Sequence, residues 1–261
     1  MDGPAARVKG KQKATAADVS EQPPPSCSEL PASLRRLEYL DFDTARFDLR
    51  AATSKMLAAV SEEIGCFPAE NGSLESFRAS NATFRSFSVR LLLRRSVSED
   101  LEFLGTYERL VTEVLCPHLK SLMRQRSGVT GPVCFSYQYP PTLRLQPGPS
   151  EEYKLPHRDA IYGHQVGELN FWMPLTNYSE MTRVTLWVES EPDLGDFQPL
   201  EIDYGSIAMF HGTLCNHKVP PNESEFTRVS MDFRIGLGDF YDKNWSLRGV
   251  KAEHGRKELW L

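Results

Sequence analysis

The sequence lacks the features of several protein classes. It has no apolar run long enough to cross a bilayer, and its N-terminus lacks the apolar centre of a secretory signal. It has no dense stripe of lysine and arginine, and its formal net charge of −5 argues against nucleic-acid binding. Its five cysteines contain no CxxC pair, so we expect neither a disulfide framework nor a zinc knuckle. These absences predict a protein of the reducing cytoplasm with no nucleic-acid or membrane partner.

The N-terminal segment 1–32 differs in composition from the rest of the chain. It is rich in Lys, Ala, Pro and Ser and poor in large apolar residues. Such a segment cannot bury enough apolar surface to fold, which predicts a disordered tail, although an organelle-targeting role stays open. The whole chain is 40% hydrophobic, and we expect residues 33–261 to form one domain around one core.

The first part of this expected domain, about 33–127, has helical periodicity. Apolar residues recur at helical spacing from Asp48 to Ile64, which predicts a helix that ends at Gly65. A loop rich in Ser, Asn and Gly follows. The stretch SEDLEFLGTYERLVTEVLCPHLKSLMRQ then predicts an amphipathic helix capped by Ser98.

After Gly128 the pattern changes to short β-branched and aromatic runs separated by Pro, Gly, Asn and Asp. This alternation is typical of an antiparallel β-sandwich or barrel, which we expect over about 128–240. No fixed-period repeat links the runs, which argues against a propeller or solenoid. The runs are VCFSYQY, TLRLQ, ELNFWMPL, RVTLWVES, GSIAMFHG and TRVSMDFRIG.

Candidate metal ligands occur in two short motifs. In HRD, His157 and Asp159 are two residues apart, so their side chains leave the same face if the segment is extended. A lone HxD triplet is weak evidence, because polar surface segments also contain it. Downstream, FHGTLCNH supplies His211 and His217. Two histidines and one carboxylate leave half of an octahedron open, as expected of a non-haem Fe(II) oxygenase.

A strand-like run near the end of the β-rich part alternates in character. Arg228 and Ser230 share one face, whereas Val229, Met231 and Phe233 share the other. A buried arginine offers a planar fork to a carboxylate, and a hydroxyl two residues on adds a donor. This pair therefore indicates a bound dicarboxylate.

HRD, CNHKVPPN and FTRVS together resemble the motifs of Fe(II)/2-oxoglutarate-dependent dioxygenases of the phytanoyl-CoA hydroxylase-related superfamily. Within it, HRDAIYGHQVGELNFWMPLTN, TLWVES and TRVSMDFR are similar to the StrG-like subset of aminoglycoside antibiotic clusters. The resemblance covers roughly the second half of the chain. It implies an α+β fold with a double-stranded β-helix, a jelly roll of the cupin type, buttressed by the N-terminal helices. The stretch RVTLWVESEPDLGDF departs from the acyl-CoA hydroxylases, which argues against an acyl-CoA substrate.

The resemblance also implies roles for individual residues. His157, Asp159 and His217 would bind Fe(II) as the catalytic residues, and Arg228 with Ser230 would bind the cosubstrate 2-oxoglutarate. His217 is preferred to His211 because its interval to Arg228 is the family's. The implied reaction hydroxylates a small molecule and releases succinate and CO2, with ascorbate as a candidate stimulant. Desaturation and cyclisation stay open, whereas the presence of Asp159 disfavours halogenation.

Further residues are weaker candidates for cosubstrate or substrate contact. Asn170 and Trp172 share a face of one strand-like run and could line the 2-oxoglutarate pocket, or be an ordinary hydrogen bonder and a core tryptophan. For Arg144, Tyr162 and His164, surface or structural roles are favoured over substrate contact.

Two residues close to His217 also need an interpretation. His211 is expected either to support the ligands or to be a satisfied polar residue at the barrel rim. Cys215 is interpreted as a packed thiol, because a soft thiolate ligand would favour zinc.

Two other functions remain open. A cupin-type metal enzyme that does not use 2-oxoglutarate would keep the ligands but would not need Arg228 and Ser230. A catalytically silent binding module could use the same barrel. The sequence predicts neither the identity of the substrate nor the oligomeric state.

Overall fold

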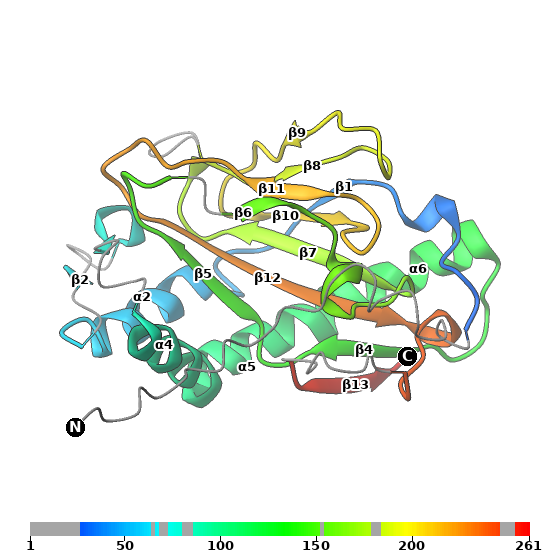
Figure 1. Ribbon diagram of the computed structural model, residues 1–261. Coiled ribbons are helices and arrows are strands. Elements are labelled where there is room, and N and C mark those ends of the chain that lie inside the picture. The colour runs from blue at the N-terminus through cyan, green and yellow to red at the C-terminus, as the bar shows by residue number, and fades with distance from the viewer. Residues whose placement is uncertain are drawn as a thin grey trace, which may run out of the picture.

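The computed structural model describes residues 27–63, 66–67, 73–79, 86–151, 154–178, 184–245 and 254–261 (Figure 1). Most of the tail expected at 1–32 lies outside these residues, as does Gly65. The helix expected from Asp48 to Ile64 is shorter than expected, because it ends at Ala59 with Val60 as its C-cap. No helix in the described ranges has the length and apolarity that a membrane span requires.

The longer helices precede most of the strands in the chain. They are α2 (Leu49–Ala59), α4 (Phe87–Glu99), α5 (Leu101–Leu110), the π-helical η4 (Val111–Leu115) and α6 (Cys116–Ser127). Gly128 ends α6 in the left-handed conformation with φ of 69°, which glycine adopts without a steric penalty. Short 3-10 helices are η1 (Ala32–Leu34), η3 (Leu74–Ser76), η5 (Asp159–Tyr162) and η7 (Gly238–Phe240).

The helix cap expected at Ser98 is at Asp100 instead. Ser98 lies inside α4 and donates its hydroxyl hydrogen bond to the Arg95 carbonyl. Asp100 accepts a hydrogen bond from the backbone N–H of Phe103, and its negative charge is favourable at the helix N-terminus. The helix α4 itself was not expected, because its buried face is a narrow stripe of Val89, Leu93 and Val97 among charged residues.

In the described part of the chain, the strands form two main antiparallel sheets and one hairpin-sized sheet. The larger sheet has the order β1–β10–β7–β12–β4–β13, and β5 also pairs with β12. Its strands are β1 (Glu38–Asp41), β4 (Cys134–Gln138), β5 (Thr142–Gln146), β7 (Glu168–Pro174), β10 (Ser206–Phe210), β12 (Arg228–Leu237) and β13 (Arg256–Trp260). The smaller sheet has the order β6–β11–β8–β9, with β6 (Lys154–His157), β8 (Trp187–Val188), β9 (Gln198–Pro199) and β11 (His217–Val219). The last sheet pairs β2 (Cys66–Phe67) with β3 (Arg78–Ala79).

The two faces of the larger sheet are covered by different layers. Val229, Met231 and Phe233 of β12 belong to the main hydrophobic core, which also contains the buried residues of α2, α5 and α6. On the opposite face, Trp172 and Phe210 share a second apolar cluster with residues of the smaller sheet. Figure 1 shows the smaller sheet at the top of the view and the helices on the other side of the larger sheet. The antiparallel β-rich second half and the alternation along β12 are therefore confirmed.

Phe233 connects the larger sheet to the helical layer. Its ring stacks on Phe171 of β7 with centroids 5.3 Å apart, and it meets the ring of Tyr107 on α5 edge-on at 5.0 Å. We expect Phe233→Ala to lower the free energy of unfolding by about 3 to 5 kcal/mol, because it leaves a cavity in a closed core. Urea unfolding measures this change. Phe87→Ala is the control, since Phe87 is 75% exposed, and an equal loss in both variants would contradict the layer assignment.

Candidate metal centre

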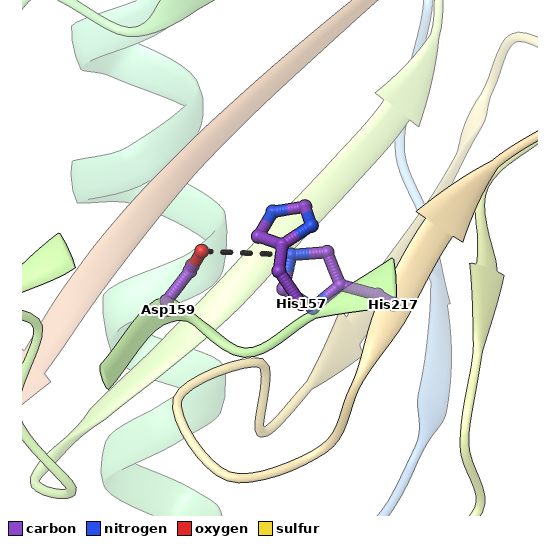
Figure 2. A group of neighbouring side chains, drawn as sticks. All are labelled: His157, Asp159 and His217. Carbon is purple, nitrogen blue, oxygen red and sulfur yellow. Dashed lines mark ion pairs between the residues drawn. The ribbon is translucent and has the colours of Figure 1, made fainter. Parts of the chain in front are cut away.

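The pairing of two short strands brings the two candidate histidine ligands together. β6 and β11 are antiparallel neighbours, and His157 lies directly opposite His217 in their register. The centroids of the two imidazole rings are 4.4 Å apart. Figure 2 shows both rings side by side, with the carboxylate of Asp159 directed toward them. One ligand atom from each of His157, Asp159 and His217 can be chosen so that all three lie within 4.8 Å of one another.

Asp159 reaches this position because the chain stays extended for one residue after β6. Arg158 has φ of −111° and ψ of 148°, so the side chains on either side of it point the same way, as the HRD spacing predicts. The 3-10 helix η5 then begins at Asp159. The backbone N–H of Asp159 donates to the carbonyl of Gly212, which ties this corner to the turn that precedes β11.

Hydrogen bonds fix the orientation of both imidazoles. Nδ1 of His157 lies 2.8 Å from the carbonyl of Leu155, and Nδ1 of His217 lies 3.2 Å from the carbonyl of Cys215. A carbonyl only accepts, so each Nδ1 carries the proton and each Nε2 keeps its lone pair. Burial, reinforced by the neighbouring His217, lowers the pKa of His157 to about 4. His157 is therefore neutral at pH 7, as metal coordination requires.

The carboxylate of Asp159 is ionised although it is buried. Burial alone would raise the pKa of Asp159, but the charge of Arg234 outweighs it and holds this pKa well below its usual range. Nε and Nη2 of Arg234 donate to Oδ2 of Asp159, and Nδ2 of Asn170 donates to the same oxygen. The other oxygen, Oδ1, lies 3.5 Å from Nε2 of His217. The site thus combines two imidazole nitrogens with one carboxylate oxygen.

Arg234 is a residue that the sequence motifs did not single out. It lies on the same strand as Arg228, and the alternation of β12 places both on the face opposite the helical core. The even spacing of Arg228 and Arg234 along one strand was the sequence pattern that could have identified Arg234. The family interval measured from His217 directed attention to Arg228 alone.

The two residues expected to bind 2-oxoglutarate are deeply buried on β12. Arg228 is 2% exposed and Ser230 is fully buried. The Ser230 hydroxyl has no hydrogen-bond partner among the described residues. Arg228 lies opposite Gln146 of β5, and Ser230 lies between Arg144 of β5 and Pro174 of β7.

Other candidates on this face have partners within the protein. Asn170 contacts Asp159, as described above, and Trp172 is part of the apolar cluster between the sheets. Arg144 forms an ion pair with Asp232, from Nε to Oδ1 at 2.6 Å and from Nη2 to Oδ2 at 3.2 Å.

Tyr162 and His164, which follow Asp159 in the chain, contact different residues. The ring of Tyr162 is 40% exposed and meets His157 edge-on, with centroids 5.5 Å apart. Nδ1 of His164 instead contacts Oε1 of Glu168 at 2.6 Å, and the ring stacks on His254.

His211 and Cys215 are both buried outside the group of ligand atoms. Nε2 of His211 donates to the carbonyl of Val166, and burial lowers the pKa of His211 to about 4. Cys215 belongs to the apolar cluster between the sheets, and burial raises the pKa of its thiol to about 11. Its packing agrees with an apolar role for this thiol.

Comparisons with known proteins give one sequence relative. No protein-family model matches the chain. The streptomycin biosynthesis protein StrG of Streptomyces griseus is 29% identical over 163 residues, which cover 56% of this chain and 77% of StrG. The similarity to StrG-type proteins that the motifs indicate is therefore confirmed.

Several solved structures of non-haem enzymes are distantly similar. The non-haem monooxygenase ThoJ in its nickel complex has a TM-score of 0.48 at 13% identity, covering 82% of this chain and 80% of ThoJ. SnoN, a non-haem alpha-ketoglutarate-dependent epimerase from nogalamycin biosynthesis, has a TM-score of 0.43 at 16% identity, covering 77% of this chain and 78% of SnoN.

Gly212 allows the close approach on which the Asp159 corner depends. A Cβ atom at this position would lie 2.6 Å from Nδ2 of Asn170, closer than van der Waals contact permits. We expect Gly212→Ala to displace Asn170 from Asp159 and to weaken divalent-metal binding about 10-fold, as changes behind a metal ligand commonly do. Equilibrium titration with Co(II) measures this affinity.

The matched control is Gly131→Ala, because a Cβ at Gly131 meets nothing within 4 Å. Its metal affinity should equal that of the wild type. Unchanged affinity in Gly212→Ala would show that the Asn170 contact does not support the site.

A second buried carboxylate near the site, that of Glu168, is paired within the protein. Glu168 is fully buried, accepts a hydrogen bond from His164 and forms an ion pair with Arg256. Burial alone would raise the pKa of Glu168, but the charge of Arg256 and the bond from His164 hold it at about 2. Because this pKa is below the ordinary value of about 4.3 in the unfolded chain, the ionised Glu168 stabilises the fold above that pH. The stabilisation is lost as the pH falls from about 4 toward 2.

We therefore expect the wild type to lose more unfolding free energy than Glu168→Gln when the pH is lowered from 7 to 3. Urea unfolding at both pH values measures the two losses. An equal loss in both proteins would contradict the low pKa of Glu168.

Proposed function

We propose that the protein is an Fe(II)- and 2-oxoglutarate-dependent oxygenase that hydroxylates a small molecule and releases succinate and CO2. The observation that carries this proposal is the convergence of His157, Asp159 and His217, whose ligand atoms lie within 4.8 Å of one another. Two neutral imidazoles and one carboxylate on one side of an ion leave the other side open for cosubstrate and dioxygen. The donor set therefore fits Fe(II).

The residues of β12 fit a dicarboxylate cosubstrate. Ser230 contributes a buried hydroxyl without a partner among the described residues, which is costly unless a ligand contacts it. Arg228, two residues away on the same face, supplies a buried guanidinium of the kind that pairs with carboxylates. A metal enzyme that does not use 2-oxoglutarate would leave the Ser230 hydroxyl without a role.

The roles of this chain's residues follow from their contacts. When bound, iron and 2-oxoglutarate supply the oxidising chemistry that replaces a C–H bond with C–OH. His157 and His217 would hold the metal through Nε2, and Asp159 would neutralise one of its charges through Oδ1. Arg228 and Ser230 would bind a carboxylate of the cosubstrate. Phe210, whose ring lies 5.6 Å from that of His217, helps to exclude water from this side of the site.

We propose further that the two main sheets are the halves of a double-stranded β-helix, and that residues 33–261 form one domain. The apolar cluster shared by the sheets and the helices on the outer face of the larger sheet support this arrangement. StrG is named for streptomycin biosynthesis, which supports a small molecule as the substrate.

Spectroscopy of the anaerobic protein tests both halves of the proposed site. We expect Fe(II) with 2-oxoglutarate to give a weak metal-to-ligand charge-transfer band in the visible, and Asp159→Ala to abolish it. Arg228→Ala should raise the 2-oxoglutarate concentration at half-saturation about 10- to 100-fold, because it removes a charge-assisted hydrogen-bonded pair.

The iron affinity of Arg228→Ala should stay close to that of the wild type, since Arg228 is outside the ligand group. Wild-type protein that binds iron but shows no band would refute the cosubstrate assignment. An equal loss of iron and 2-oxoglutarate binding in Arg228→Ala would mean that Arg228 supports the fold instead.

A further inference from the structure

Arg234 makes an unusual contact with the carboxylate of Asp159. Its Nε and Nη2 atoms both donate to Oδ2, at 2.9 Å and 2.6 Å, and neither donates to Oδ1. Nδ2 of Asn170 adds a third donor to Oδ2 at 2.6 Å. A carboxylate oxygen has two lone pairs, so Oδ2 has no capacity left for a metal ion.

A neighbouring ion pair on the same face shows the ordinary alternative. Arg144 contacts Asp232 with one nitrogen on each carboxylate oxygen, the bidentate arrangement in which both oxygens are used. Such a fork on Asp159 would engage Oδ1 as well and would compete with metal binding. Arg234 therefore differs from Arg144 because it leaves one carboxylate oxygen, Oδ1 of Asp159, without a guanidinium contact.

Other side chains hold the guanidinium of Arg234 in this orientation. Its Nη1 atom donates to Oε1 of Gln138 on β4 at 3.2 Å and lies 3.7 Å from Oδ2 of Asp232. Nε2 of Gln138 in turn contacts the hydroxyl of Thr142 at 3.0 Å. Arg234 is 5% exposed, so water does not compete for these contacts.

We propose that Arg234 is a positioning residue that restricts Asp159 to coordination of the metal through the single oxygen Oδ1. The proposal depends on the metal site of the proposed function but not on its cosubstrate. Without the two hydrogen bonds that Arg234 donates to Oδ2, Asp159 can rotate and offer both oxygens to the ion. A bidentate carboxylate would then occupy a coordination position that the open half of the site requires.

Arg234→Lys tests the proposal, because lysine keeps the positive charge but cannot place two donors on one oxygen. The probe is Co(II) alone, whose visible absorption reports both affinity and coordination number. We expect the Co(II) dissociation constant to rise about 10- to 100-fold, because an Asp159 that Arg234 no longer orients binds the ion less well, and the intensity of the absorption bands to change as Asp159 offers both oxygens. Circular dichroism establishes that the variant is folded.

Arg256→Lys is the matched control. Arg256 also pairs with a buried carboxylate of the larger sheet, that of Glu168, but Glu168 is outside the ligand group. This variant should keep the wild-type Co(II) affinity and spectrum. A wild-type spectrum and affinity in folded Arg234→Lys, or an equal change in Arg256→Lys, would overturn the proposal.

If Arg234→Lys does not fold, Gln138→Ala decides the question. This change removes the acceptor that holds Nη1 of Arg234, so a smaller change in the same direction is expected, and an unaltered Co(II) spectrum would overturn the proposal. Wild-type protein that binds no Co(II) through His157, Asp159 and His217 would also overturn it. Wild-type protein that binds Co(II) but never consumes 2-oxoglutarate would refute only the proposed function.

Discussion

The antiparallel register of β6 and β11 is the constraint on which the candidate site depends. It places His157 directly opposite His217, two residues that are far apart in the chain. Asp159 joins them because the chain remains extended through Arg158 and then turns into η5. A shift of this register by one residue would turn one imidazole to the opposite face of the sheet and separate the ligands.

The two faces of the larger sheet have different roles, since one packs in the main core and the other carries residues of the candidate site. On β12, the side chains of Val229, Met231 and Phe233 pack against the helical layer. The alternate residues Arg228, Ser230, Asp232 and Arg234 place charged groups and one hydroxyl on the opposite face. A rigid apolar face thereby fixes the positions of Arg228, Ser230 and Arg234, which is the support that a precise ligand geometry requires.

The two buried aspartates on the site face are paired within the protein. Asp159 and Asp232 are paired with Arg234 and Arg144, respectively, and Arg234 also approaches Asp232. Burial alone would raise the pKa of Asp232, but the charge of Arg144 keeps this pKa below its usual value. Removing one partner of such a pair leaves an uncompensated charge, so the network favours one arrangement of the side chains.

Sequence patterns predicted the parts of this structure that depend on local chemistry. The strand-like run TLRLQ coincides with β5, and the alternation along β12 matches its two faces. The spacing within HRD predicted that His157 and Asp159 lie on one side.

The remaining features depend on contacts between distant segments, which periodicity does not report. One missed feature is local: the helix cap is Asp100 rather than Ser98, because the Asp100 carboxylate accepts from the backbone N–H of Phe103. The edge strands β1 and β13 lack strong alternation and are defined by their pairing with β10 and β4. The contact of Arg234 with Asp159 joins two distant segments, so the sequence alone does not report it.

Crystals grown anaerobically with Fe(II) would test the central claim most directly, through the anomalous scattering of the metal. The account predicts one strong peak within bonding distance of Nε2 of His157, Nε2 of His217 and Oδ1 of Asp159. A crystal with no metal between these three atoms, or with iron bound only elsewhere, would contradict it.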